Sequence, residues 1–327
     1  MKALVTGATG FVGSHLAEAL GAKGCEVHCL VRPTSDLKWL RGLNVRLAYG
    51  ALSDRRSLAE AVSGKDCVFH CAAVTKTRRP EQFFEVNAQG TRNVLAACKE
   101  RNPTVGRIIY VSSQAAAGPS PDGTPATEER PCRPVSLYGK SKYEGELAVA
   151  DFASQLPTTI IRPSAVYGPR DRDMLIFFQL ASCGIFPLVG SRKGRVSLIH
   201  VNDLAQAIIL VAESRQAVGQ TYFAADPRPY DLTEAGALIA QAVGRKCRTV
   251  RIPIFVAWAL AHLARIATAC GAAPIAFNPD KIRELSHPFW VCSTEKIAST
   301  VDFKPRYSLS EGLIETARWY RENGLLR

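Results

Sequence analysis

Residues 2–13 read KALVTGATGFVG, an apolar stretch that leads directly into a glycine-rich turn. The residues that follow, 15–22, are predicted to form a helix. In such a strand–turn–helix, Gly7 permits the tight turn, Gly10 lets backbone approach a diphosphate, and Gly13 lets the helix pack on the strand. The helix start adds free N–H groups and a positive dipole end. The pattern predicts a dinucleotide-binding site. The alternative interpretation is a tight turn whose small residues serve only helix–strand packing.

The composition indicates a folded protein with a large core. The chain has 327 residues and is 47% hydrophobic, which suits one large domain or two closely packed ones. The net charge of +12 is dispersed, with short basic clusters at 76–79, 192–195 and 245–248. No basic stripe is interleaved with aromatic residues, so we expect no nucleic-acid partner. The clusters are either solvated surface or an attraction for an anionic small molecule.

Cysteine usage points to a reducing compartment. None of the ten cysteines forms a C-x-x-C pair, and the six histidines do not cluster with them, so we expect no metal site. Because the first predicted strand begins at residue 2, we expect no signal peptide and a cytoplasmic location. Disulfides are not expected there.

Apolar runs alternate with helical segments through the first half of the chain. Predicted strands at 25–31, 45–49, 67–73, 107–113 and 158–162 are separated by helices such as 53–63, 83–100 and 136–155. This alternation predicts an α/β fold with a doubly wound, Rossmann-type parallel sheet. We expect residues 1–170 to form the nucleotide-binding domain, with 195–225 returning to it. Residues 171–327 are expected to form a smaller, mixed substrate-binding lobe. The proline-rich stretch 114–137 is expected to be a functional loop.

Three residues have the chemistry of a proton-transfer site. Tyr138 and Lys142 are four residues apart at the start of a predicted helix, so they share one face. A nearby ammonium is expected to lower the pKa of the phenol, which suits a general acid and base. The predicted strand 108–113 ends in Ser112 and Ser113, and a serine there can hydrogen-bond a substrate carbonyl. The alternative for Tyr138 and Lys142 is a solvated helix face.

The combined motifs resemble the extended short-chain dehydrogenase/reductase family, which includes NAD-dependent epimerases and dehydratases. The matching stretches are GATGFVG at 7–13, VFHCAA at 68–73, NAQGT at 87–91, VSS at 111–113, YGKSK at 138–142 and RPSAVYG at 162–168. The resemblance implies a Rossmann domain with a nicotinamide cofactor. It also implies that Tyr138 is the acid/base and that Lys142 lowers its pKa and holds the nicotinamide ribose. Ser113 is the implied catalytic serine, with Ser112 as second choice. Asn87 matches the family's helix asparagine, or is an ordinary helix cap.

The resemblance also implies a set of cofactor contacts. These are Gly7, Thr9, Gly10, Phe11, Val12, Arg32, Leu52, Ala72, Ala73, Tyr138, Lys142, Pro163 and Val166. A NAD site usually has an acidic residue after the second strand, for the ribose hydroxyl. This chain has Arg32 there, and a guanidinium suits a phosphate, with Ser35 able to add a hydroxyl. We therefore expect NADP(H) rather than NAD(H). Ala51 replaces an aspartate of many relatives, which leaves adenine to Leu52 backbone and apolar packing.

Two departures from the sugar-nucleotide members suggest another substrate. Those members carry asparagine where this chain has Ala165, and an arginine clamp where it has Val196; Arg195 is one position off, on the opposite face of a strand. We expect a small, largely apolar substrate with a hydroxyl or ketone. Within the family, the chain resembles bacterial members labelled dihydroflavonol reductase-like or hopanoid-associated sugar epimerases. The alternatives are a sugar-nucleotide epimerase or dehydratase, and a non-catalytic cofactor-binding scaffold.

Residues 252–277 are strongly apolar. Pro253 and Pro274 bracket the segment, and His262 and Arg265 interrupt it. The unbroken apolar run is shorter than the roughly 20 residues of a membrane-spanning helix. We expect a helix that closes over a pocket, with an interfacial membrane contact as the alternative. The family resemblance also suggests a homodimer that pairs through the helix carrying Tyr138.

Overall fold

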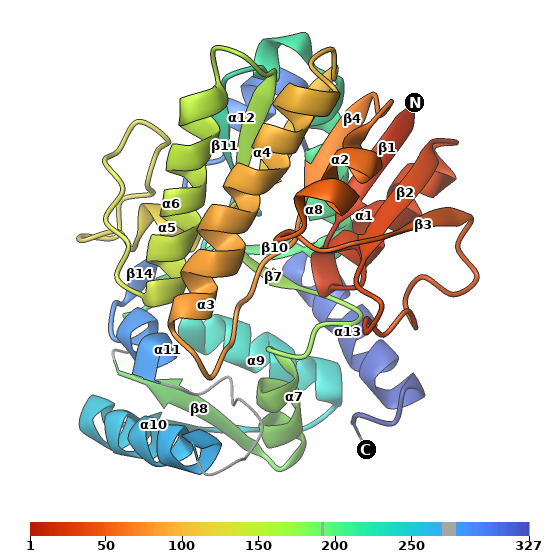
Figure 1. Cartoon of the computed structure of the whole chain (residues 1–327). Helices are drawn as coiled ribbons and strands as arrows, with labels where there is room; N and C mark the ends of the chain where they lie inside the picture. Colours follow the sequence, from red (N-terminus) through yellow and green to blue (C-terminus); the bar gives the residue numbers. More distant parts are fainter. Residues whose placement is uncertain (191–192, 270–278, 327) are drawn as a thin grey trace.

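The structure, a computed structural model, describes residues 1–190, 193–269 and 279–326. A seven-stranded sheet runs through the larger part of the molecule, with helices on both faces (Figure 1). Its strands are β1 (Lys2–Thr6), β2 (Glu26–Val31), β3 (Val45–Tyr49), β4 (Cys67–His70), β5 (Arg107–Val111), β6 (Thr158–Pro163) and β11 (Thr221–Ala224). All pair in parallel, in the order β11-β6-β5-β4-β1-β2-β3. The predicted Rossmann-type sheet is confirmed.

Alternation along β1 explains why both faces of the sheet carry helices. Ala3 and Val5 join one apolar core, beneath α1 (Phe11–Ala22) and α8 (Val201–Glu213). Leu4 points to the other core, beneath α2 (Arg55–Val62), α4 (Gly90–Arg101) and α6 (Leu137–Phe152). Strand order reverses at β1, which lies between β2 and β4. In open α/β sheets, ligands bind at the carboxyl end of the strands at this reversal.

The C-terminal lobe has its own core and three small sheets. Its helices are α7 (Leu175–Ser182), α9 (Leu232–Val243), α10 (Ile254–Ala269), α11 (Pro279–Leu285) and α13 (Leu309–Glu322). The strands are β7 (Ala165–Tyr167) with β10 (Leu198–His200), β8 (Ile185–Val189) with β13 (Arg248–Ile252), and β12 (Tyr230–Asp231) and β14 (Phe289–Trp290) on either side of β9 (Arg195–Val196). Phe178, Phe186, Leu313 and Tyr320 fill the core.

Several short elements complete the described structure. They are α3 (Glu81–Phe84), the π-helical turn η1 (Glu85–Gln89), α5 (Gln114–Ala117), the short η2 (Arg215–Ala217) and α12 (Glu295–Val301). Strand β11 pairs with β6, so chain from beyond residue 170 completes the large sheet. The division of the chain near residue 170 stays our proposal.

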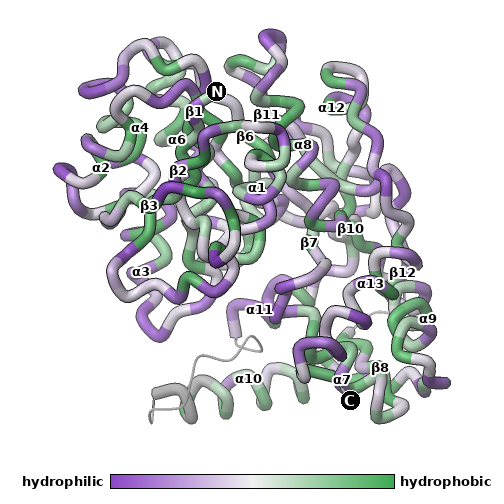
Figure 2. The backbone as a smooth tube through the Cα atoms, turned by 90° about the vertical axis from the view of Figure 1, so that its right-hand side faces the viewer, coloured by the Kyte–Doolittle hydropathy of each residue, from purple (hydrophilic) through white to green (hydrophobic). Residues whose placement is uncertain are grey.

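One expectation about local structure needs correction. The stretch 114–137 is not entirely loop, because α5 begins it, with the Ser113 hydroxyl accepting from the Ala115 N–H as a cap. That 252–277 closes over a pocket stays a prediction. Helix α10 packs on α11 and runs along the lower margin of the molecule, where Figure 2 shows it in mostly apolar colours. Residues 270–278 lie outside the described part.

Candidate active site

The turn after β1 is packed so closely that two of its glycines have no room for a side chain. Gly7 has a φ of +71°, and a Cβ there would lie 2.6 Å from the Ala72 Cα. A Cβ on Gly13 would lie 2.2 Å from the Gly7 carbonyl oxygen. These contacts bring the start of α1 against both β1 and the loop after β4. The sequence argument for close helix–strand packing at Gly13 is therefore matched by the geometry.

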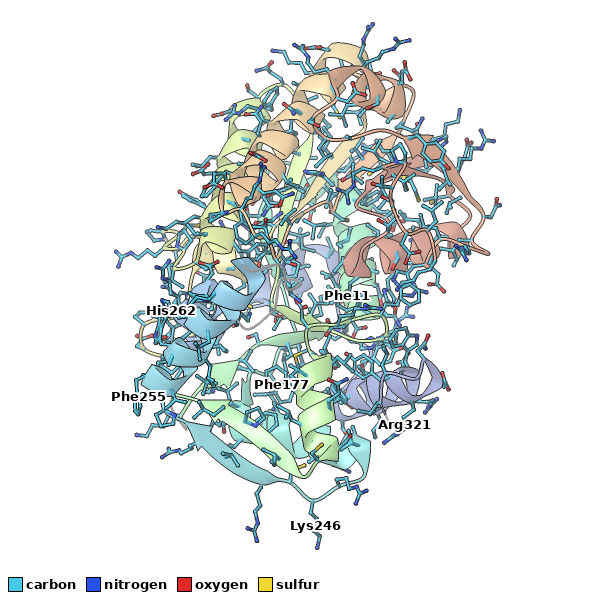
Figure 3. The ribbon with its side chains drawn as sticks, turned by 60° about the horizontal axis from the view of Figure 1, so that its bottom comes forward. Phe11, Phe177, Lys246, Phe255, His262 and Arg321 are labelled. Atoms are coloured by element: carbon cyan, nitrogen blue, oxygen red, sulfur yellow. The ribbon has the colours of Figure 1, made fainter. Side chains whose placement is uncertain are left out.

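The third glycine leaves the surface of the turn open. Gly10 is exposed and lies at the N-cap of α1, where no side chain caps the helix. No acidic side chain occupies the first turn of α1, and Phe11 and Val12 begin it. Figure 3 shows Phe11 at the end of α1 that faces the middle of the molecule. Uncapped N–H groups and an exposed glycine fit a dinucleotide diphosphate.

Other expected cofactor residues follow the carboxyl ends of neighbouring strands. Ala72 and Ala73 come directly after β4, and the Ala72 N–H donates to the Thr6 Oγ1 at 3.3 Å. Pro163 ends β6, and the next residue, Ser164, has a buried hydroxyl without a hydrogen-bond partner in the described structure. A buried polar atom in that position fits a ligand that supplies the missing bond.

The remaining expected cofactor residues lie on either side of the carboxyl edge of the sheet. Leu52 follows β3 and packs against Gly90, and its carbonyl oxygen accepts from the Asn93 Nδ2 at 2.8 Å. Val166 lies in β7, opposite Ile199 of β10. Thr9 lies in the turn before Gly10 and is partly buried.

Arg32 lies in an exposed turn immediately after β2. The Arg32 N–H donates to the Ser35 Oγ at 3.2 Å, and the Ser35 N–H donates to the Arg32 carbonyl at 2.9 Å. These bonds fix the backbone of the turn. Within the described residues, no ion-pair partner is found for the Arg32 guanidinium. The turn therefore offers a fixed backbone and an available cation beside the nucleotide turn.

Ser112 and Ser113, both after β5, have different partners. The Ser112 Oγ donates to the Glu146 Oε1 at 2.5 Å, and Glu146 forms a buried ion pair with Arg162 at 2.6 Å. The Ser113 hydroxyl instead lies near the Tyr138 phenol and acts to lower the pKa of that phenol. Ser112 therefore belongs to a buried structural network, whereas Ser113 lies beside the phenol.

The helix that carries Tyr138 begins with a serine cap. The Ser136 Oγ accepts from the Gly139 N–H at 2.9 Å. One turn along α6, Lys142 is only 1% exposed, and its Nζ donates to the Val111 carbonyl at 2.8 Å and lies 4.1 Å from the centre of the Tyr110 ring. Burial lowers the pKa of Lys142 to about 7. The ammonium is held rigidly beneath the site by the end of β5.

The expected lowering of the Tyr138 pKa is wrong for this structure. Removal of water by the surrounding protein raises the pKa to about 12, and the Ser113 hydroxyl offsets only part of that rise. The carboxylates of Glu284 and Asp173 raise it further. The Lys142 Nζ, for its part, donates to the Val111 carbonyl.

Asn87 links the loop after β4 to α6, the helix that carries Tyr138. It is fully buried in η1, and its Oδ1 accepts from the Val74 N–H at 2.7 Å. Its Nδ2 donates to the Val74 carbonyl at 3.0 Å and to the Ser141 Oγ at 2.9 Å. The alternative of an ordinary helix cap is wrong, because Asn87 lies inside a helical run. Asn87 therefore ties the loop after β4 to Ser141, three residues after Tyr138 in α6.

A buried histidine, which the sequence reasoning did not single out as a site residue, connects the sheet to η1. The Thr91 Oγ1 donates to the Asn87 carbonyl at 2.6 Å, so it accepts from the His70 Nε2 at 3.0 Å. The other ring nitrogen, Nδ1, then accepts from the Thr6 Oγ1 at 2.7 Å. Burial lowers the pKa of His70 to about 3, so the ring is neutral. Two strands beneath the nucleotide turn are thus joined through one imidazole.

Two carboxylates of the C-terminal lobe contact the start of α6, and the sequence patterns did not identify them. The Asp280 carboxylate accepts from the Leu137 N–H at 2.7 Å and from the Tyr138 N–H at 3.2 Å. The Glu284 Oε1 accepts from the Ser136 Oγ at 2.7 Å. Both lie on α11, and negative charge at a helix start is stabilising. No local pattern could have shown this contact, because it joins segments more than 140 residues apart.

Comparison with known proteins agrees with this geometry. Residues 3–225 match the NAD dependent epimerase/dehydratase family, which covers most of the chain and every motif described above. A ceramide reductase of Caulobacter vibrioides is 36% identical, over 98% of this chain and 95% of that protein.

Two solved structures share the whole fold. The crystal structure of gox2253 has a TM-score of 0.84 and 30% identity, and covers 100% of this chain and 99% of its own. DesIV, a dTDP-glucose 4,6-dehydratase from Streptomyces venezuelae solved with NAD and TYD bound, has a TM-score of 0.81 and 25% identity, with the same coverage. This chain therefore belongs to the NAD dependent epimerase/dehydratase family, as an enzyme that uses a nicotinamide cofactor for hydride transfer.

Proposed function

We propose that the protein catalyses reversible hydride transfer between NADP(H) and a hydroxyl or ketone on a small, largely apolar substrate. The observation that carries this proposal is the nearness of the Ser113 hydroxyl to the Tyr138 phenol, beside an open, glycine-lined nucleotide turn. Ser113 and Tyr138 present two hydroxyls together at the carboxyl edge of the sheet, and Lys142 anchors the same helix from below.

Tyr138 and Ser113 have separate roles in the proposed carbonyl reduction. The nicotinamide, when bound, supplies the hydride. The Tyr138 hydroxyl gives its proton to the substrate oxygen, and the Ser113 hydroxyl donates a hydrogen bond to that oxygen as negative charge develops. The raised pKa of Tyr138, about 12, keeps its proton in place before the transfer. In the oxidation direction, the same phenol takes the proton back.

Arg32 supports the proposed preference for NADP(H). Its side chain stands in the turn where a NAD site carries a carboxylate, and the described structure shows no ion pair that would occupy it. A guanidinium can bind a ribose phosphate through two parallel hydrogen bonds. The net charge of +12 attracts the more anionic cofactor in addition.

The second half of the chain supports an apolar substrate. Val196 packs against the lobe core instead of presenting a cation, and the Arg195 side chain lies 3.9 Å from the Asp231 carboxylate. Neither residue offers the diphosphate clamp that a sugar nucleotide requires. The relative with 36% identity is named a ceramide reductase, and ceramide is a lipid.

A sugar-nucleotide epimerase or dehydratase is the second candidate. The family match and the likeness to DesIV, a dTDP-glucose 4,6-dehydratase, favour it. A third candidate, a cofactor-binding scaffold without activity, would need to lack a catalytic group. Ser113, Tyr138 and Lys142 are all present, which argues against it.

One panel of measurements separates these candidates. Purified protein is melted with the oxidised or reduced form of NADP(H) or NAD(H), each alone and with long-chain hydroxy or keto lipids or with UDP- and dTDP-sugars. Lipid turnover is followed by the change in cofactor absorbance. Sugar turnover is followed by analysis of the sugar product, because an epimerase or dehydratase returns the hydride to its own substrate. The proposal expects stabilisation by NADPH above NADH, and turnover with a keto lipid. Stabilisation and turnover with a sugar nucleotide alone would establish the second candidate instead. NADPH binding without turnover of any class would support the scaffold.

A further inference from the structure

Helix α10 presents an apolar face to solvent. Its Ala257 and Ala261 are buried against Ile282 of α11. On the opposite side, Phe255 is 71% exposed, Leu263 62% and Ile266 58%. A surface helix normally directs polar side chains to water, so the pattern on α10 is reversed.

These exposed side chains form one continuous stripe. Phe255, Ala259 and Leu263 follow one another at intervals of four residues, and Ile266 continues the row. The polar group beside them, His262, directs its Nδ1 to the Trp258 carbonyl at 2.8 Å. Figure 3 shows Phe255 and His262 along the outer side of α10, away from the lobe.

A cationic border lies directly before this stripe. Residues 235–279 contain no aspartate or glutamate. Arg245, Lys246, Arg248 and Arg251 are all exposed, in the turn after α9 and in β13, and β13 leads through Pro253 into α10. Among the described residues none of the four has an ion-pair partner. Lys246 extends outward beyond the lobe in Figure 3.

We propose that this surface, defined by the α10 stripe and the four preceding cations, docks the protein on an anionic lipid bilayer. The apolar side chains enter the headgroup boundary while the cations contact lipid phosphates, which is the arrangement of an interfacial helix. No described helix has the length and apolarity of a transmembrane span, and α10 has 16 residues, so it lies in the plane of the interface. Each cation at an anionic surface strengthens binding about fivefold.

The charge pattern favours a bilayer over a second copy of the chain. In a two-fold contact the same patch meets itself, so the cations of each copy would face a segment without a single carboxylate and gain no ion pair. An anionic membrane instead offers opposite charge next to an apolar layer. The inference is independent of the proposed function, since it concerns where the protein binds and not which substrate it converts.

The contribution of the four cations is tested by flotation of the full chain with phosphatidylcholine vesicles, with and without phosphatidylglycerol. We expect binding to the anionic vesicles, weakened by high salt. The double variant K246E/R248E is expected to bind at least about 25-fold more weakly, at fivefold per cation. K99E/R101E makes the same charge change at the far end of α4, at the opposite end of the molecule from α10 in Figure 1, and should bind within a few-fold of the unchanged protein.

The contribution of the apolar stripe is tested with a double variant, Phe255→Ser combined with Leu263→Ser. The control variant is Ile314→Ser, which changes an exposed position on α13. Thermal melts confirm that each variant is folded. The first variant should lose vesicle binding and the second should keep it. The proposal is overturned if the full chain ignores anionic vesicles, or if both charge variants behave alike. It is also overturned if light scattering shows a dimer that the Phe255 and Leu263 exchanges dissociate.

Discussion

The sheet edge and the C-terminal lobe contribute to the site in different ways. On the sheet side, Asn87 and Lys142 are buried, and their polar atoms bond to main-chain groups. On the lobe side, Asp280 and Glu284 approach the same helix from the short α11, and the neighbouring α10 exposes apolar side chains. The sheet therefore fixes the positions of the proposed reacting side chains. The lobe, in contrast, changes the pKa of Tyr138 through its carboxylates and exposes an apolar helix face. Four experiments test this contrast.

The largest effect is expected for Tyr138→Phe, which removes the proton donor from the sheet side. Turnover should fall by about 10³-fold, within the usual range for loss of a general acid, because the substrate oxygen then has no proton source. NADPH affinity, measured by fluorescence titration, should stay nearly unchanged. Tyr143→Phe, on the same helix, is the matched control and should keep full activity. Retained activity in the Tyr138 variant would remove this residue from the mechanism.

The nucleotide turn should respond next most strongly. A side chain at Gly13 meets the Gly7 carbonyl oxygen at 2.2 Å, so Gly13→Ala is expected to lower the free energy of unfolding by about 3 kcal/mol and to weaken cofactor binding. Gly21→Ala, in the same helix with nothing within 4 Å, should instead stabilise by about 0.8 kcal/mol. Urea denaturation measures both. Equal effects would mean that close packing does not decide this turn.

Arg32→Asp should exchange the cofactor preference. Loss of a charge-assisted phosphate contact is expected to weaken NADPH binding about 30-fold, while NADH binding improves, since a carboxylate accepts from the ribose hydroxyls. Arg41→Asp makes the same charge change at an exposed position nearby and serves as the control. If both variants weaken NADPH equally, the effect is general electrostatics and Arg32 has no specific role.

The smallest effect concerns the lobe side. The Glu284 carboxylate helps to raise the pKa of Tyr138, so Glu284→Gln should lower that pKa. Reduction needs the protonated phenol, so the alkaline limb of its pH–rate profile should move to lower pH. The glutamine oxygen can still accept from the Ser136 hydroxyl. Glu322→Gln, exposed on α13, should leave the profile in place. A shift to higher pH would contradict the assigned charge effect.

Local patterns predicted the elements that depend on neighbouring residues. Strand alternation and glycine spacing are properties of a few consecutive residues, and the parallel sheet and the turn at Gly7 follow from them. The spacing of Tyr138 and Lys142 likewise places both on one helix face. The sequence pattern alone does not separate Ser112 from Ser113. In the structure Ser112 is bonded to Glu146, whereas Ser113 is the serine that acts on the Tyr138 pKa.

The sequence by itself determined the fold class, the family and the residues with suitable chemistry, because these depend on short-range order. Only the tertiary structure decided the environment of those residues. The Tyr138 pKa rises instead of falling because surrounding atoms remove water and because the Glu284 and Asp173 carboxylates lie near enough to raise it further. The Asp280 and Glu284 contacts join segments more than 140 residues apart. Desolvation and long-range charge are properties of the packed chain, and no local pattern encodes them.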